Sequence, residues 1–213
     1  MKLFRLFLLA GIAFFAVSWF SGSALWKKTE AIHLSKKAFS YPVSNRIEKK
    51  LEEKAFAAKH FIRQKKFNDN VCFLLDMSLP SGQNRYFIYD LKKDSLIHAG
   101  LVAHGNCFQY WLEGRQYSNV VGSGCTSLGK YKIGNHYTRK FGYSYKLYGL
   151  DSANSNAFER TVVLHSHSCV PDSEINEEIC QSNGCPTVLP TFLEKLKAII
   201  NNSGKPILLW IYE

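Results

Sequence analysis

Residues 161–165, which read Thr-Val-Val-Leu-His, and residues 180–186, which read Cys-Gln-Ser-Asn-Gly-Cys-Pro, carry the strongest signals in this chain. The first is an apolar β-branched run that predicts a buried strand ending in His165. The second places Cys185 directly after a glycine, whose backbone freedom permits a tight turn. A thiol on a turn and an imidazole at a strand end are the parts of a cysteine–histidine nucleophile.

The two stretches have the residue types that acyl chemistry needs. Cysteine attacks as a thiolate, and a neighbouring imidazole or backbone dipole lowers its pKa from about 8.5. Backbone N–H groups on the turn can face a developing oxyanion. His167 lies two residues beyond His165 and faces the same side if the strand continues, so it is the competing base. A buried structural cysteine is the alternative interpretation of these residues alone.

The rest of the chain predicts many short strands and few helices. Apolar runs bounded by turn residues predict strands over residues 71–75, 85–91, 96–103, 131–133, 145–148, 161–166 and 207–212. An amphipathic helix is expected over 45–66, opened by a capping box of Asn45 and Glu48. A second helix is expected from the capping box of Thr191 and Glu194 to about Gly204. This pattern predicts a mainly β domain over residues 69–213.

The N-terminus predicts export. Lys2 and Arg5 precede an uncharged apolar stretch, and residues 1–26 fit either a cleaved signal peptide or a retained membrane anchor. Residues 27–68 follow as a basic linker with the amphipathic helix. The net charge of +10 is spread over short Lys pairs without a long basic tract. Export and the absence of a long basic tract exclude a nucleic-acid partner. The positive charge then forms a solvated basic face or attracts an anionic polymer of the envelope.

Six cysteines accompany the export signal, at positions 72, 107, 125, 169, 180 and 185. Disulfides form in exported proteins. If Cys185 is a free thiol, five cysteines remain, so at least one more is unpaired. A bond between Cys169 and Cys180 would staple the loop between His165 and Cys185, but the sequence does not fix the connectivity.

The spacing of these residues resembles a known family. Sixteen residues separate His165 from Ser182, and Ser182-x-Gly184-Cys185 follows. This resembles the L,D-transpeptidase (YkuD-like) catalytic domain, whose motif is His, fourteen to seventeen residues, then Ser/Thr-His-Gly-Cys. Residues 126–133 are similar to the family's Thr-Pro-x-Gly-x-Phe-x-Ile segment. Segments 85–91 and 102–105 resemble its divergent murein L,D-transpeptidase branch, and the likeness covers roughly residues 70–213.

The resemblance implies a β-sandwich or barrel-like catalytic domain and a mechanism. Cys185 would attack the carbonyl before the terminal D-Ala of a peptidoglycan tetrapeptide stem, releasing D-Ala and forming a thioester. The amine of a second stem would resolve the thioester into a 3→3 cross-link. The implied catalytic residues are Cys185, His165, Ser182 and Gly184, and the implied substrate-binding residues are His104, Tyr131, Arg160 and Asn183. No metal or organic cofactor is implied, and the location would be the periplasm or cell envelope.

Two departures from the family pattern stand beside the cysteine. Asn183 replaces the usual His before Gly-Cys, and Pro186-Thr187 occupy the positions where an Arg commonly follows.

Three other functions stay open. Water as acceptor would make a hydrolase, either an L,D-carboxypeptidase or a murein–protein amidase. His165, His167 and Cys169, with Cys180 and Cys185, would offer ligands for zinc. A non-catalytic wall-binding module would not need the thiol.

Overall fold

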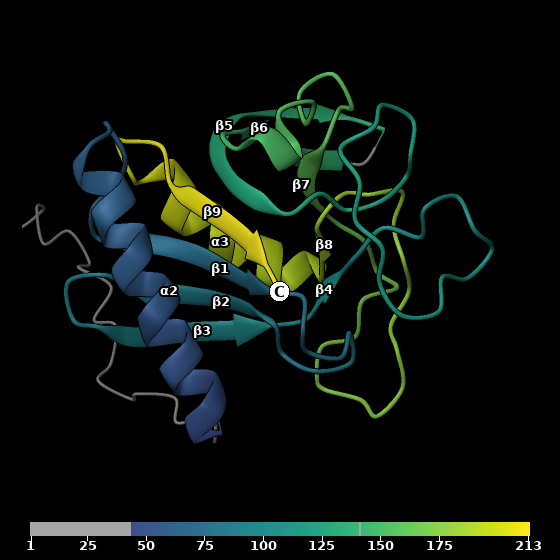
Figure 1. Cartoon of the computed structure of the whole chain (residues 1–213), viewed down its shortest axis with the longest axis horizontal. Helices are drawn as coiled ribbons and strands as arrows, with labels where there is room; N and C mark the ends of the chain where they lie inside the picture. Colours follow the sequence, from purple (N-terminus) through teal and green to yellow (C-terminus); the bar gives the residue numbers. More distant parts are fainter. Residues whose placement is uncertain (1–43, 141) are drawn as a thin grey trace, which may run out of the picture. The chain divides into compact units, whose positions relative to one another are not determined.

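The computed structural model describes residues 44–140 and 142–213, which form one nine-stranded sheet (Figure 1). The spatial strand order is β3-β2-β1-β9-β5-β6-β7-β8-β4. The pairs β1–β9 and β7–β8 are parallel and the other pairs are antiparallel. The strands are β1 (Val71–Asp76), β2 (Tyr86–Asp90), β3 (Ser95–Gly100), β4 (Val102–Ala103), β5 (Gly129–Arg139), β6 (Gly142–Gly149), β7 (Val163–Ser166), β8 (Thr187–Val188) and β9 (Leu208–Tyr212). The predicted mainly β fold is confirmed.

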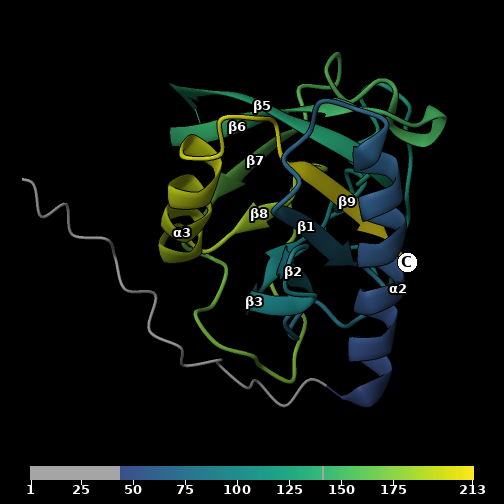
Figure 2. The same ribbon diagram turned by 90° about the vertical axis from the view of Figure 1, so that its left-hand side faces the viewer.

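Two helices cover opposite faces of the β1–β2–β9 region, as Figure 2 shows. Helix α2 (Asn45–Arg63) buries Leu51, Ala55, Ala58 and Ile62 against one face. Helix α3 (Pro190–Asn201) buries Phe192, Leu193 and Leu196 against the other. Because side chains alternate along a strand, Cys72 and Leu74 of β1 face α2, whereas Phe73 and Leu75 face α3. Burial of both faces explains the continuous apolar run of β1.

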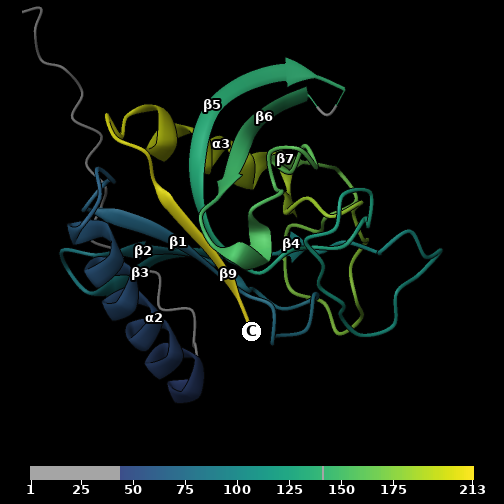
Figure 3. The same cartoon turned by 45° about the horizontal axis from the view of Figure 1, so that its top comes forward.

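The sheet curls into a nearly closed barrel through β5 and β6, whose bend is visible in Figure 3. The pairing of β5 with β6 shifts register between Ile133 and His136. Such a bulge bends a strand and increases its twist. The curl brings β7, β8 and β4 together at the end of the sheet, where the predicted His165 and Cys185 lie.

Three local predictions are wrong. The run 96–103 is not one strand. The first part, β3, ends at Gly100, where an added Cβ would lie 2.8 Å from the ring of Phe192. The second part, β4, pairs with β8 instead. Neither predicted capping box forms. Ser44 is the N-cap of α2, and Leu189 is that of α3, without a side-chain capping bond. The fixed φ of Pro190 suits the first turn, so α3 begins one residue before Thr191.

The signal peptide or anchor predicted over residues 1–26 and most of the linker lie outside the described residues. The predicted helix over 45–66 is confirmed as α2. Among residues 44–140 and 142–213, no helix has the length and apolar character needed to cross a membrane.

Candidate active site

The segment that carries Cys185 is a turn held by hydrogen bonds to the strand end at residues 104–106. Ser182 N–H donates to the His104 carbonyl at 2.8 Å, and Asn106 N–H donates to the Ser182 carbonyl at 2.8 Å. Ser182 Oγ donates to the Cys185 carbonyl at 2.6 Å and accepts from Gly184 N–H at 3.2 Å. The Ser182 side chain therefore fixes the turn itself.

Gly184 is required by this turn. Its φ of 105° lies in a region that L side chains rarely adopt. A Cβ on Gly184 would lie 2.7 Å from the Cys125 carbonyl oxygen. The glycine before the cysteine thus serves both the backbone conformation and close packing, as the sequence indicated.

Cys185 is a free, partly buried thiol. Burial raises its pKa above the ordinary value, while the backbone N–H of Val163 and the Arg160 guanidinium favour the thiolate. Burial is the largest of these effects, so the resting group is the neutral thiol at pH 7. Attack by Cys185 therefore requires a base that removes the proton.

His165 sits near the end of β7, in parallel register with Thr187 of β8. Its Nδ1 lies 3.2 Å from the Ser166 carbonyl oxygen, and its Nε2 lies 2.9 Å from Thr187 Oγ1. A carbonyl only accepts, which assigns the proton to Nδ1 and leaves Nε2 as an acceptor. Burial lowers the pKa of His165, so the imidazole is neutral and able to take a proton at Nε2.

One pocket of about 200 Å³ is lined by both members of the predicted cysteine–histidine pair, Cys185 and His165. It is lined by Ala103, His165, His167, Cys169, Cys180, Gln181, Ser182, Asn183, Cys185 and Thr187. His167 is exposed, and its Nδ1 accepts from Cys169 N–H at 3.1 Å. His165 is only 5% exposed and is fixed by its contact with Thr187. The more rigid of the two imidazoles is therefore His165.

Four cysteines form disulfides, which pair Cys107 with Cys125 and Cys169 with Cys180. The unpaired thiols are Cys185 and the buried Cys72. The Cys169–Cys180 bond spans the segment between the two histidines and the turn that carries Cys185. It also removes two of the ligands that the zinc alternative needs. Within the described residues, no group of three or more His, Cys, Asp or Glu side chains is arranged to hold a metal ion.

A family comparison gives this geometry its context. Residues 43–212 match the family model described as L,D-transpeptidase catalytic domain. The chain belongs to the L,D-transpeptidase catalytic domain family. The resemblance noted from the sequence is thereby confirmed. Among curated proteins, no sequence matches this L,D-transpeptidase domain.

Several solved structures are similar to this L,D-transpeptidase domain. An L,D-transpeptidase from Stackebrandtia nassauensis has 13% identity over 76% of this chain and 65% of its own, with a TM-score of 0.41. One from Xylanimonas cellulosilytica has 13% identity over 70% and 63%, with a TM-score of 0.38. The cell shape determining protein Pgp2 of Campylobacter jejuni has 11% identity over 76% and 56%, with a TM-score of 0.42. The chain covers less than two thirds of each of these structures.

The residues predicted to bind substrate are not all in the pocket of this L,D-transpeptidase domain. Asn183 is exposed and lines the pocket. Arg160 donates to the carbonyls of Ser118, at 2.6 Å, and Cys125, and its charge acts on the Cys185 thiol. Tyr131 is buried, and its hydroxyl donates to the Ser127 carbonyl at 2.6 Å, with its pKa raised by burial to about 12.

His104 lies behind the turn that carries Cys185. Its side chain is 1% exposed, and its Nδ1 accepts from Arg85 Nη2 at 2.9 Å. Burial and the nearby Arg85 and Arg115 lower the pKa of His104 to about 4. Arg85 is itself fully buried, and its Nε and Nη2 donate to the Val102 carbonyl at 3.0 and 2.7 Å. His104 is thus placed to hold Ser182 through its carbonyl.

Two residues of the site were missed by the sequence analysis. Thr187 Oγ1 contacts His165 Nε2 and lies 3.3 Å from the Cys185 carbonyl oxygen. Gln181 Oε1 accepts from Leu112 N–H at 2.9 Å, and Gln181 Nε2 donates to the Leu112 carbonyl at 2.8 Å. A signal existed for Thr187, because it occupies the position where the family commonly has an Arg. The Gln181 contact joins residues too far apart in sequence for a pattern to show it.

Proposed function

We propose that the protein is an exported L,D-transpeptidase that uses Cys185 as a nucleophile on peptidoglycan tetrapeptide stems. The observation that carries this proposal is the pocket in which a free thiol, a buried neutral imidazole and a glycine turn meet. Family membership supports the same reaction class. Residues 1–26 would deliver the domain to the periplasm or cell envelope, as a cleaved signal or as an anchor.

In the first step, Cys185 Sγ attacks the carbonyl carbon that precedes the terminal D-Ala. After the Thr187 hydroxyl turns from Nε2 to the Cys185 carbonyl, His165 takes the thiol proton at Nε2 and then gives it to the amine of the leaving D-Ala. A thioester to Cys185 remains. The amine of a second stem attacks this thioester, His165 removes the extra proton, and the thiol is restored as the new amide forms.

Thr187 suits both protonation states of His165. Its hydroxyl donates to the neutral Nε2 at 2.9 Å in the resting state. When Nε2 gains a proton, the same hydroxyl can turn to the Cys185 carbonyl, 3.3 Å away, and accept from the imidazolium. We infer that Thr187 holds His165 in place and stabilises its charged form.

The turn also offers an oxyanion donor. Gly184 N–H is occupied by Ser182 Oγ. Among the described residues, no backbone carbonyl accepts from Cys185 N–H. This N–H is therefore the donor that we assign to the developing oxyanion.

The proposal is tested by intact mass spectrometry of the protein incubated with a carbapenem. We expect one covalent adduct on Cys185, and none on the Cys185→Ala variant, which keeps the fold. Defined tetrapeptide muropeptides then separate the two acceptors: dimers with released D-Ala support transfer, whereas tripeptide without dimers would assign a hydrolase. An unmodified wild-type mass together with unchanged muropeptides would overturn the proposal.

A further inference from the structure

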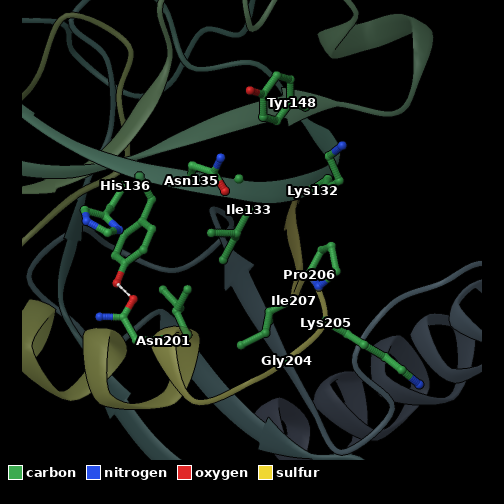
Figure 4. A pocket seen from close by; sticks show the side chains of 13 residues that line it. Lys132, Ile133, Asn135, His136, Tyr148, Asn201, Gly204, Lys205, Pro206 and Ile207 are labelled. Carbon is green, nitrogen blue, oxygen red and sulfur yellow. Dashed lines mark hydrogen bonds between the residues drawn. The ribbon is translucent and has the colours of Figure 1, made fainter.

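A second concave region shares no lining residue with the Cys185 pocket. It consists of two adjoining pockets of about 410 Å³ each, which have Lys205 in common. Figure 4 shows the first pocket, between β5, the end of α3 and segment 204–207. The second pocket is formed by the end of α2 and the residues around Asp69 and Leu91. We call the two together the basic groove.

Positive charge dominates the basic groove. Its charged lining consists of Lys59, Arg63, Lys65, Lys92, Lys132 and Lys205, with Asp69 as the carboxylate. Lys92 pairs with Asp69 at 2.7 Å, and Lys59 pairs with Asp94 at 2.6 Å. Among the described residues, no ion pair is formed by the other four cations. A groove with this excess of cations attracts an anionic ligand.

The uncharged lining of the first pocket suits a sugar. The bulge of β5 leaves Asn135 and His136 exposed at the pocket. Asn201 adds an amide, which accepts from Tyr145 at 2.7 Å. Amides bind hydroxyl and acetamido groups.

We propose that the basic groove binds an anionic polysaccharide chain. Its carboxylate or phosphate groups would contact Lys132 and Lys205, and successive sugar units would occupy the two pockets. A linear chain fits two adjoining pockets better than a flat membrane surface does. Such a site would hold the enzyme on an envelope polymer while the Cys185 pocket works on the stem. Binding at the groove is independent of the Cys185 chemistry.

The test uses the full chain and fluorescently labelled oligogalacturonate, which carries carboxylates, with a phosphate-bearing polysaccharide and neutral dextran beside it. We expect anisotropy changes with the anionic chains, loss of binding at high salt, and no change with dextran. Removing two cations in the double variant Lys132→Ala/Lys205→Ala lowers the affinity by about tenfold at low salt. The control Arg46→Ala/Lys49→Ala removes the same charge from exposed positions on α2 and binds like wild type.

Three results would overturn the inference. They are equal binding to dextran, an equal loss in the control variant, or binding to anionic phospholipid vesicles without binding to the polysaccharides. The carbapenem acylation rate of Lys132→Ala/Lys205→Ala stays at the wild-type value, which also shows that the variant is folded. Polysaccharide binding without any acylation of wild-type protein would count against the proposed function and leave the groove standing.

Discussion

At the scale of single residues, the site depends on the protonation states of Cys185 and His165, which their surroundings set. Burial keeps the Cys185 thiol protonated and His165 neutral. This pair is the combination that general base catalysis requires, because the base is free to accept and the thiol has a proton to lose. Thr187 completes the set from the strand beside β7.

We predict that Thr187→Val slows acylation by a carbapenem by about fivefold. Valine keeps the shape of threonine but leaves His165 Nε2 without the hydroxyl, and a lost hydrogen bond of this kind costs about 1 kcal/mol. Stopped-flow or mass-resolved acylation rates measure the effect. Thr187→Ser restores most of the rate, since it retains Oγ. A valine variant as fast as wild type would contradict the role of Thr187.

The pH dependence of acylation is the second prediction at this scale. Burial lowers the pKa of His165 below its ordinary value of 6.5, so the neutral base persists to lower pH than a solvated histidine would. We expect the acylation rate to fall on the acidic side with a midpoint below pH 6.5. A profile measured with wild-type protein and His167→Gln separates the two imidazoles. If His167 were the base, its replacement would remove the acidic limb along with the activity.

At the scale of elements, the turn that carries Cys185 is held from both sides. The Cys169–Cys180 bond ties its start to the segment after β7, and the His104 carbonyl anchors Ser182. Both cysteines also line the active-site pocket. The turn is therefore positioned by a covalent link and by the end of β4.

We predict that Cys169→Ser/Cys180→Ser lowers the free energy of unfolding by about 3 kcal/mol, because the bond closes a short loop in the unfolded chain. Urea denaturation followed by tryptophan fluorescence measures it. The Cys185 acylation rate falls in the same variant, since the turn loses its link. The comparison variant is Cys72→Ala, which changes a buried free thiol that is not part of the pocket lining, and it should keep the acylation rate. An unchanged urea midpoint in the double variant would refute this prediction.

At the scale of the whole molecule, two buried neutral histidines link stability to pH. His104 has its pKa lowered to about 4 by burial, Arg85 and Arg115, and burial also lowers that of His165. The unfolded chain binds protons at about 6.5. The folded state therefore binds fewer protons between these values, and its stability falls as the pH drops from about 6.5 towards 4.

We predict that His104 alone accounts for about 3 kcal/mol of this loss between pH 7 and 4. Urea midpoints across the range measure the total. NMR titration of the histidine Cε1–H signals gives the share of His104, whose signal should stay in the neutral position at pH 5. A His104 signal that titrates near 6.5 would disprove the assignment.

Local patterns in the sequence were sufficient for most of the strands and for the amphipathic α2, and they singled out the thiol and imidazole of the candidate site. They succeed because β-branched runs, helical spacing and a glycine before a cysteine act through neighbouring residues. The capping boxes failed because helix starts also depend on the preceding backbone, as Ser44 and Pro190 show.

The sequence alone determined a mainly β domain and predicted Cys185 and His165 as its reactive pair. The tertiary structure decided which cysteines pair, that the run 96–103 divides between two neighbours, that His104 supports the turn from behind, and that Thr187 contacts the base. Each of these depends on contacts between segments distant in the chain. The curl of the sheet brings these segments into contact, so local patterns in the sequence cannot predict the contacts.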